Sequence, residues 1–166
     1  MRPLALILLL LPSLSHAFCF DQAGQKYNID PDLLKAIATQ ESSLNPNATN
    51  DNKNKHGVVV SRDYGLMQFN SSWFKQLAQF HVNKDNVMEP CFNVHLGAWV
   101  LASNFSTHGY NWNSVGAYNA GFKPSKQKIR DEYVTKIKRH YLKIKSSKNN
   151  PSHSKALIYK RRSLIQ

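Results

Sequence analysis

Acidic residues are scarce in this chain. Its 166 residues include 10 Asp or Glu against 22 Lys or Arg, a formal net charge of +12. The excess lies at one end, because residues 1–122 hold eight basic and eight acidic residues whereas residues 123–166 hold fourteen and two. Such a basic end suits nucleic acid, anionic lipid or an acidic wall polymer, or simply keeps the chain solvated. No sequence signature of a nucleic-acid-binding fold accompanies it, so we expect no nucleic-acid partner.

Cysteine is nearly absent, which limits both disulfides and metal sites. There are only two cysteines, and the seven histidines include no close pair at the helical spacing that zinc sites use. We therefore expect neither a metal nor another cofactor. In an oxidising compartment Cys19 and Cys91 would form one disulfide, and the alternative is a pair of buried free thiols.

Long apolar runs are also missing. The run Leu4–Leu11 has eight apolar residues, too few to cross a bilayer as a helix. Arg2 before this run and Ser15-His16-Ala17 after it are typical of a secretory signal peptide. We expect residues 1–17 to be removed after Ala17, leaving a periplasmic protein without a stable membrane anchor. The alternative, a retained membrane anchor, is disfavoured by the short run.

Sustained strand alternation is absent as well, so the sequence predicts a mostly α protein. Helices are expected over residues 21–27, 31–44, 70–80, 92–105, 112–120 and 126–145. The polar stretch 45–64 is loop-like, but Val58-Val59-Val60 within it predicts a short strand or hairpin arm. We expect residues 18–145 to form one monomeric domain. Residues 146–166 have little helical periodicity and predict a basic flexible tail.

One carboxylate occupies a position where charge is costly. Asp30 is a good N-cap for the helix predicted over residues 31–44. Glu41 lies on the apolar stripe of this helix, four residues after Ile37 and seven after Leu34. Apolar surroundings raise the pKa of a carboxyl group, so Glu41 should keep its proton near neutral pH. Such a group can protonate the leaving oxygen of a glycosidic bond, or it can merely hydrogen-bond a helix end.

Three short motifs favour the catalytic interpretation. Glu41-Ser42, Gly65-Leu66-Met67-Gln68 and Ala117-Tyr118-Asn119-Ala120-Gly121 occur in that order. In this respect the chain resembles the lytic transglycosylases of the goose-lysozyme-like superfamily, the SLT domain, over about residues 19–142. The resemblance implies a single lysozyme-like domain, here with a small hairpin insertion. The short chain, signal peptide and early cysteine are most similar to specialised members that accompany conjugation, pilus or secretion machines.

The resemblance also implies a substrate and a set of roles. Glu41 would cleave the bond between N-acetylmuramic acid and N-acetylglucosamine in peptidoglycan glycan strands, forming a 1,6-anhydro ring. No second carboxylate is required, because the N-acetyl group of the sugar can support the positive centre. The implied substrate-binding residues are Gln68, Tyr118 and Asn119 along a sugar cleft, Met67 in its apolar wall, and Tyr133 as a hydrogen-bond partner of the glutamate.

Two other functions remain open at this point. A hydrolytic muramidase would keep the fold and use a second carboxylate, for which Asp51 and Asp63 are the candidates. A wall-binding assembly protein without activity would use the basic tail to dock a secretion or conjugation component. The presence of Glu41 on an apolar stripe argues against binding alone.

Overall fold

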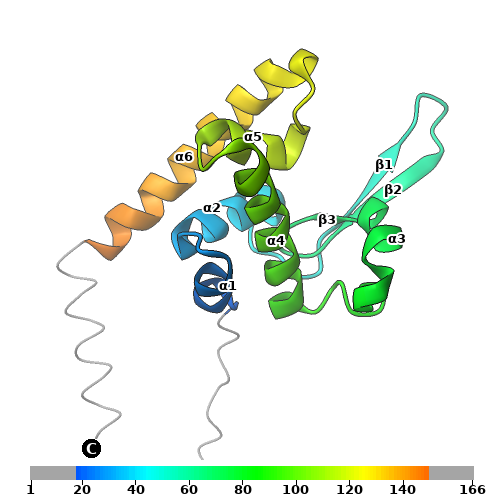
Figure 1. Ribbon diagram of the computed structural model, residues 1–166, viewed down its shortest axis with the longest axis horizontal. Helices are drawn as coiled ribbons and strands as arrows, with labels where there is room; N and C mark the ends of the chain where they lie inside the picture. The colour runs from blue at the N-terminus through cyan, green and yellow to red at the C-terminus, as the bar shows by residue number, and fades with distance from the viewer. Residues whose placement is uncertain (1–17, 150–166) are drawn as a thin grey trace, which may run out of the picture.

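Helices carry most of residues 18–149, the part of the chain that this computed structural model describes (Figure 1). The predicted mostly α class is confirmed. The α-helices are α1 (Phe20–Tyr27), α2 (Pro31–Ser42), α3 (Phe74–Leu77), α4 (Pro90–His108), α5 (Trp112–Ala120) and α6 (Gln127–Lys148). Short 3-10 turns are η1 (Ser71–Trp73), η2 (Ala78–Phe80) and η3 (Pro124–Lys126). The continuous helix predicted over residues 70–80 is therefore wrong in detail, since η1, α3 and η2 share this stretch.

Helix α2 begins and ends as its sequence dictates. The Asp30 carboxylate accepts a hydrogen bond from the Asp32 N–H at 2.8 Å, and Pro31 occupies the first helical position. The helix ends at Ser42 because Ser43 and Leu44 adopt left-handed backbone angles, with φ of 54° and 62°. This end is two residues earlier than predicted, and it leaves Glu41 in the last turn.

A three-stranded antiparallel sheet projects beside the helices (Figure 1). Strands β1 (Thr49–Lys53) and β2 (Val59–Tyr64) form the predicted hairpin, and β3 (Phe69–Asn70) pairs with the end of β2. The register places Asp51 opposite Arg62, and these two side chains form an exposed ion pair. The hairpin thus brings the second half of β2 back to the body of the protein.

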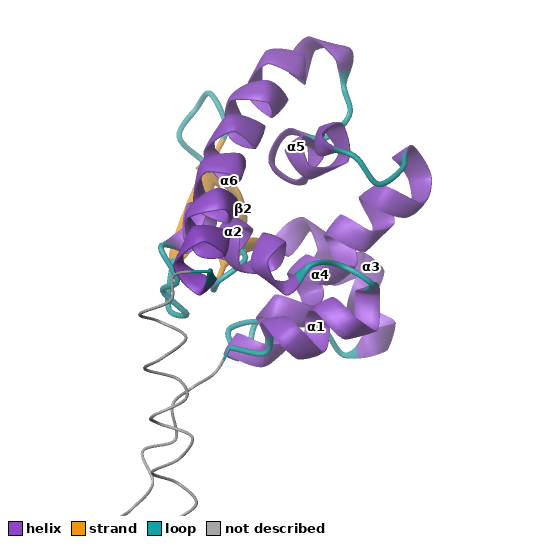
Figure 2. Ribbon diagram, turned by 90° about the vertical axis from the view of Figure 1, so that its left-hand side faces the viewer, coloured by secondary structure: helices purple, strands orange, loops and turns teal. Residues whose placement is uncertain are grey.

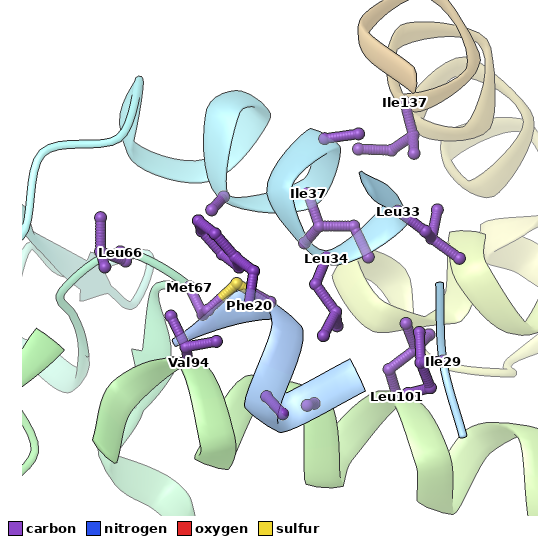
Figure 3. Close-up of a cluster of buried hydrophobic side chains, with 14 of the residues drawn as sticks. Phe20, Ile29, Leu33, Leu34, Ile37, Leu66, Met67, Val94, Leu101 and Ile137 are labelled. Carbon is purple, nitrogen blue, oxygen red and sulfur yellow. The ribbon is translucent and has the colours of Figure 1, made fainter. Parts of the chain in front are cut away.

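The main hydrophobic core surrounds α2 (Figure 3). Leu34 and Ile37 of α2 are fully buried and pack among side chains from α1, α4 and α6, such as Phe20, Leu101 and Ile137. Figure 2 shows α6 running alongside α2 and beside α5, and the two pairs of helices are in contact. A second cluster, which includes Phe69, joins the sheet to α3 and α4.

Cys19 and Cys91 form a disulfide, which confirms the pairing expected in an oxidising compartment. The bond joins the start of α1 to the start of α4 across a sequence separation of 72 residues. On the loop-entropy account, closing a loop of this length stabilises the fold by about 4 kcal/mol.

The C-terminal helix extends further than predicted. Helix α6 runs to Lys148, three residues past the expected domain boundary, because its last turns are tied to the start of α2. Lys145 Nζ lies 2.9 Å from the Asp30 carboxylate and 3.0 Å from that of Asp32, and Lys148 also pairs with Asp32.

The predicted signal peptide and residues 150–166 of the predicted tail lie outside the described residues. Within residues 18–149, no helix is both long and apolar enough to span a membrane.

Candidate active site

Glu41 lies half-buried at the end of α2 and is held by a tyrosine of α6. The Tyr133 hydroxyl donates a hydrogen bond to Glu41 Oε1, which is the contact that the family resemblance of the sequence implies. The pKa of Glu41 is raised from 4.5 to about 7, and burial is the main cause. The negative charge of Asp63 contributes to this rise, whereas the Tyr133 hydrogen bond favours the ionised form and partly opposes it. Glu41 therefore holds its proton up to neutral pH, as its place on the apolar stripe predicts.

The three sequence motifs meet beside this carboxyl group. The Ser42 hydroxyl donates to the main-chain oxygen of Leu66 at 2.9 Å, which joins the end of α2 to the turn formed by residues 65–68. The Tyr118 hydroxyl of α5 donates to the main-chain oxygen of Met67 at 2.8 Å. Burial, with the charges of Glu41 and Asp63, raises the pKa of Tyr118 well above its usual value, so this donor keeps its proton.

Asn93, a fully buried residue of α4, holds the turn of residues 65–68 through hydrogen bonds to the main chain. Its Nδ2 donates to the main-chain oxygens of Tyr64 and Val87 at 2.8 and 2.9 Å, and its Oδ1 accepts from the Met67 N–H at 2.8 Å. Gly65 has a φ of +71°, and a Cβ at this position would lie 2.6 Å from the Asn93 amide. Glycine is thus required here for both its backbone angle and its size.

We expect Asn93→Ala to lower the free energy of unfolding by about 3 kcal/mol, because three buried main-chain groups lose their partner. Urea denaturation followed by circular dichroism measures this change. Asn104→Ala is the matched control, since the Asn104 amide makes one 3.2 Å bond to the Ser114 carbonyl and should cost about 1 kcal/mol. Equal effects of the two substitutions would contradict the role given to Asn93.

Met67 does not belong to the wall of a sugar cleft, so this sequence-based assignment is corrected. Its side chain is fully buried and points into the main core (Figure 3). It packs against α4, where a Cβ on Gly97 would lie 2.6 Å from Met67 Cβ. No surface of the Met67 side chain is exposed. Met67 contributes to the site only through its main-chain oxygen, which accepts the Tyr118 hydroxyl.

The predicted sugar-binding residues Gln68 and Asn119 differ in how many of their side-chain hydrogen-bonding groups are already used within the protein. Gln68 has a φ of 48°, and its Nε2 donates to the main-chain oxygens of Gly65 and Ala48 at 2.9 and 3.2 Å. Its amide nitrogen is therefore used locally, which leaves Oε1 as the group for a ligand. Asn119 is exposed on α5, and its side chain makes no hydrogen bond to any residue between 18 and 149.

Asp63 is the second carboxylate of the site. It lies on β2 and accepts hydrogen bonds from Asn52 at 2.9 Å, Asn70 at 2.6 Å and Asn50 at 3.3 Å. Its charge acts on Glu41, whereas Asp51 is exposed and neutralised by Arg62. Of the two acids that the sequence left open, the structure thus brings only Asp63 to the site.

Arg130 supports the site and was not anticipated from the sequence. It is 4% exposed, and its Nη1 donates to the main-chain oxygens of Gly121 and Lys123 at 2.7 and 3.0 Å. Its Nε donates to the Asn113 side chain at 2.9 Å, so one guanidinium holds both ends of α5. An arginine in a basic helix carries no sequence signal of this role.

The described residues contain no cluster of three His, Cys, Asp or Glu side chains that could hold a metal ion.

The fold and the site together define a class of protein. A glutamic acid that keeps its proton near pH 7, held by a buried tyrosine in a lysozyme-like helical domain, is the arrangement of an enzyme that cleaves glycosidic bonds.

The comparisons with known proteins narrow this class. Residues 18–141 match the family described as transglycosylase SLT domain. Protein IpgF of Shigella flexneri is 41% identical over 148 residues, covering 87% of this chain and 94% of that protein. Invasion protein IagB of Salmonella typhimurium strain SL1344 is 40% identical over 130 residues, covering 78% of each chain. The chain therefore belongs to the transglycosylase SLT domain family and is a peptidoglycan lytic transglycosylase.

Solved structures agree on the fold. Lytic transglycosylase Slt from Pseudomonas aeruginosa superimposes with a TM-score of 0.59 at 19% identity, over 84% of this chain. The 70-kDa soluble lytic transglycosylase in complex with bulgecin A gives 0.52 at 21% identity, over 78% of this chain. This chain spans about a quarter of the first solved chain and a fifth of the second.

Proposed function

We propose that the chain cleaves the bond between N-acetylmuramic acid and N-acetylglucosamine without water and closes a 1,6-anhydro ring on the muramic residue. The observation that carries this proposal is the placement of Glu41, which lies half-buried in the last turn of α2, where burial raises its pKa to about 7. Tyr133 binds Oε1, which leaves Oε2 free of hydrogen bonds to residues 18–149 and available to a sugar oxygen.

In the first step Glu41 donates its proton to the glycosidic oxygen as the bond from this oxygen to muramic C1 breaks. The N-acetyl oxygen of the muramic residue supports the positive charge that develops at C1. In the second step the Glu41 carboxylate removes the proton of the C6 hydroxyl, and the C6 oxygen bonds to C1. Glu41 ends protonated again, and no water is consumed.

The glycan strand would be held by residues around Glu41. The exposed Asn119 amide and the Gln68 Oε1 are suited to hydroxyl and acetamido groups of the sugars. The half-buried Tyr118 ring, fixed through its hydroxyl, would form the side of the site that α5 provides.

Purified peptidoglycan digested with the chain tests the proposal by mass spectrometry of the products. Anhydro-muropeptides support it. Products with reducing ends, which are one water heavier, would overturn the anhydro outcome while keeping Glu41 as the acid.

A hydrolytic muramidase is the second candidate, and Asp63 is the observation that favours it. A carboxylate held by three asparagine amides and close enough to act on Glu41 is placed to stabilise positive charge at C1 or to orient a water.

We expect Asp63→Asn to separate the two reactions. If the sugar's N-acetyl group supports C1, the rate should fall by less than about tenfold, whereas a hydrolase that uses Asp63 should lose about 100-fold or more. Because the Asp63 charge raises the pKa of Glu41, the substitution should also shift the alkaline limb of the pH–rate profile to lower pH. Asp51→Asn is the matched control, since Asp51 pairs with Arg62 on the exposed hairpin and should change neither quantity.

The place of action is also part of the proposal. We propose that residues 1–17 are removed on export and that the monomeric protein acts in the periplasm, where the disulfide forms and peptidoglycan lies. The similarity to an invasion protein supports a role in opening the wall locally for a secretion, conjugation or pilus apparatus. A wall-binding assembly role without activity is less well supported, because the site retains a protonated glutamic acid.

A further inference from the structure

A small aromatic pocket lies at the opposite end of α2 from Glu41. We call it the Trp112 pocket; its apolar lining is Leu33, Phe105, Tyr110, Trp112, Val115 and Tyr141, and its volume is about 180 Å³. Asp30, which also lines it, precedes Glu41 by eleven residues, or about 16 Å along a helix. None of its lining residues belongs to the Glu41 site, so the mechanism leaves this pocket without a use.

The pocket wall is built from aromatic rings that remain partly open to solvent. Phe105 and Tyr110 stack with ring centroids 4.1 Å apart, and Trp112 meets Tyr141 edge-on at 6.4 Å. Tyr110 is 62% exposed and Trp112 37% exposed, although both rings are large and apolar. Pockets of this size and lining accept a single aromatic or leucine-sized side chain of a partner, and such anchors carry much of the energy of protein interfaces.

A basic residue of α6, Lys138, lies beside the pocket. Lys138 Nζ lies 4.9 Å from the centre of the Trp112 ring, and Leu142, one turn later, is 66% exposed. Helix α6 holds eight Lys or Arg and two acidic residues. Six of these cations form no ion pair with any residue between 18 and 149, and Lys138, beside the Trp112 ring, is one of them.

The one carboxylate in the pocket does not offset this charge. Asp30 accepts the Tyr141 hydroxyl at 2.6 Å and pairs with Lys145 at 2.9 Å, so its oxygens are already occupied. The surface is thus an apolar pocket with one unpaired cation, Lys138, beside it. It is complementary to an apolar anchor flanked by carboxylates.

We propose that the Trp112 pocket docks an acidic segment of a partner protein, which inserts one large apolar side chain between Trp112 and Tyr110 and places its carboxylates beside Lys138. A neutral sugar would not require the Lys138 cation beside the aromatic rings. Single-stranded nucleic acid requires a row of stacking platforms along an extended groove, whereas this pocket holds one side chain.

A fluorescein-labelled, acetylated peptide of sequence Glu-Glu-Asp-Leu-Phe-Asp-Glu-Leu-Glu-Glu is the probe, and fluorescence anisotropy with residues 18–166 measures its binding. We expect saturable binding that weakens about tenfold when the Leu and Phe residues of the peptide are replaced by Ser at constant charge. Trp112→Ala and Lys138→Glu should each weaken it about tenfold. The matched controls Phe80→Ala and Lys75→Glu alter an exposed aromatic and an exposed lysine elsewhere, and both variants should bind as the parent chain does.

Several results would overturn the proposal. Absence of saturable binding, or equal binding of the Ser peptide, would show that the pocket does not bind an apolar side chain of the peptide. Binding that appears only after residues 150–166 are deleted would assign the pocket to the chain's own C-terminal segment. Displacement of the peptide by oligo(dT) with no sensitivity to Trp112→Ala would assign the surface to phosphate binding instead.

Discussion

Glu41→Gln should reduce the release of muropeptides from peptidoglycan by about 10³-fold or more. The amide keeps the size of the side chain and can still accept the Tyr133 hydroxyl, but it has no proton to give to the glycosidic oxygen. The same group must remove the C6 proton in the second step, so a single substitution blocks both steps. The rate of release, followed by chromatography of soluble products, measures the effect.

Glu132→Gln is the matched control for this substitution. Glu132 is an exposed residue of α6 next to Tyr133 in sequence, and the change is the same replacement of a carboxyl group by an amide. It should leave the rate within about twofold of the parent, as surface substitutions usually do. A comparable loss in both variants would mean that the loss does not depend on proton transfer from Glu41.

Thermal unfolding shows whether Glu41→Gln remains folded. The pKa of Glu41 is higher in the folded chain than in the unfolded chain, so the folded state binds more protons between pH 4.5 and about 7. The stability of the parent therefore falls as the pH rises through this window, and Gln abolishes that loss. At pH 8 the variant should be at least as stable as the parent. A clearly less stable variant would show that the lost activity reflects unfolding.

The sequence predicted those parts of the fold and site that depend on local patterns. Asp30 and Pro31 mark the start of α2, and helical spacing alone places Glu41 on the buried face. The hairpin that contains the valine run was also predicted, because a β-branched run bounded by polar turn residues has few other structures to adopt.

Features that depend on contacts between distant segments could not be predicted in this way. Met67 follows Gly65-Leu66 in a recognisable motif, but only its packing against Gly97, far along the chain, decides that its side chain belongs to the core. Asp63 became part of the site through strand register and three asparagine amides, which composition alone did not single out. Arg130 could not be distinguished by sequence from the other basic residues of α6, because its role in holding α5 depends on its burial and not on its residue type.

Tyr133→Phe should lower kcat by about tenfold to a hundredfold and move the pH dependence in a defined direction. The hydroxyl fixes Glu41 Oε1, so its loss allows the carboxyl group to turn away from the glycosidic oxygen. This hydrogen bond also lowers the pKa of Glu41, and its removal should raise that pKa above about 7. Activity requires protonated Glu41, so the alkaline limb of the kcat profile should shift to higher pH.

Tyr141→Phe separates this role from a merely structural one. Tyr141 also lies on α6 and its hydroxyl also donates to a carboxylate of the α2 segment, but that carboxylate is Asp30, at the far end of the helix. Both substitutions cost one hydrogen bond between the same two elements, so a packing effect alone would leave the pH limb in place in both variants. Only Tyr133→Phe should move the limb upward, opposite to the shift expected for Asp63→Asn. Opposite shifts from a lost hydrogen-bond donor and a lost negative charge require that both act on one titrating group, and Glu41 is the carboxyl group on which both act.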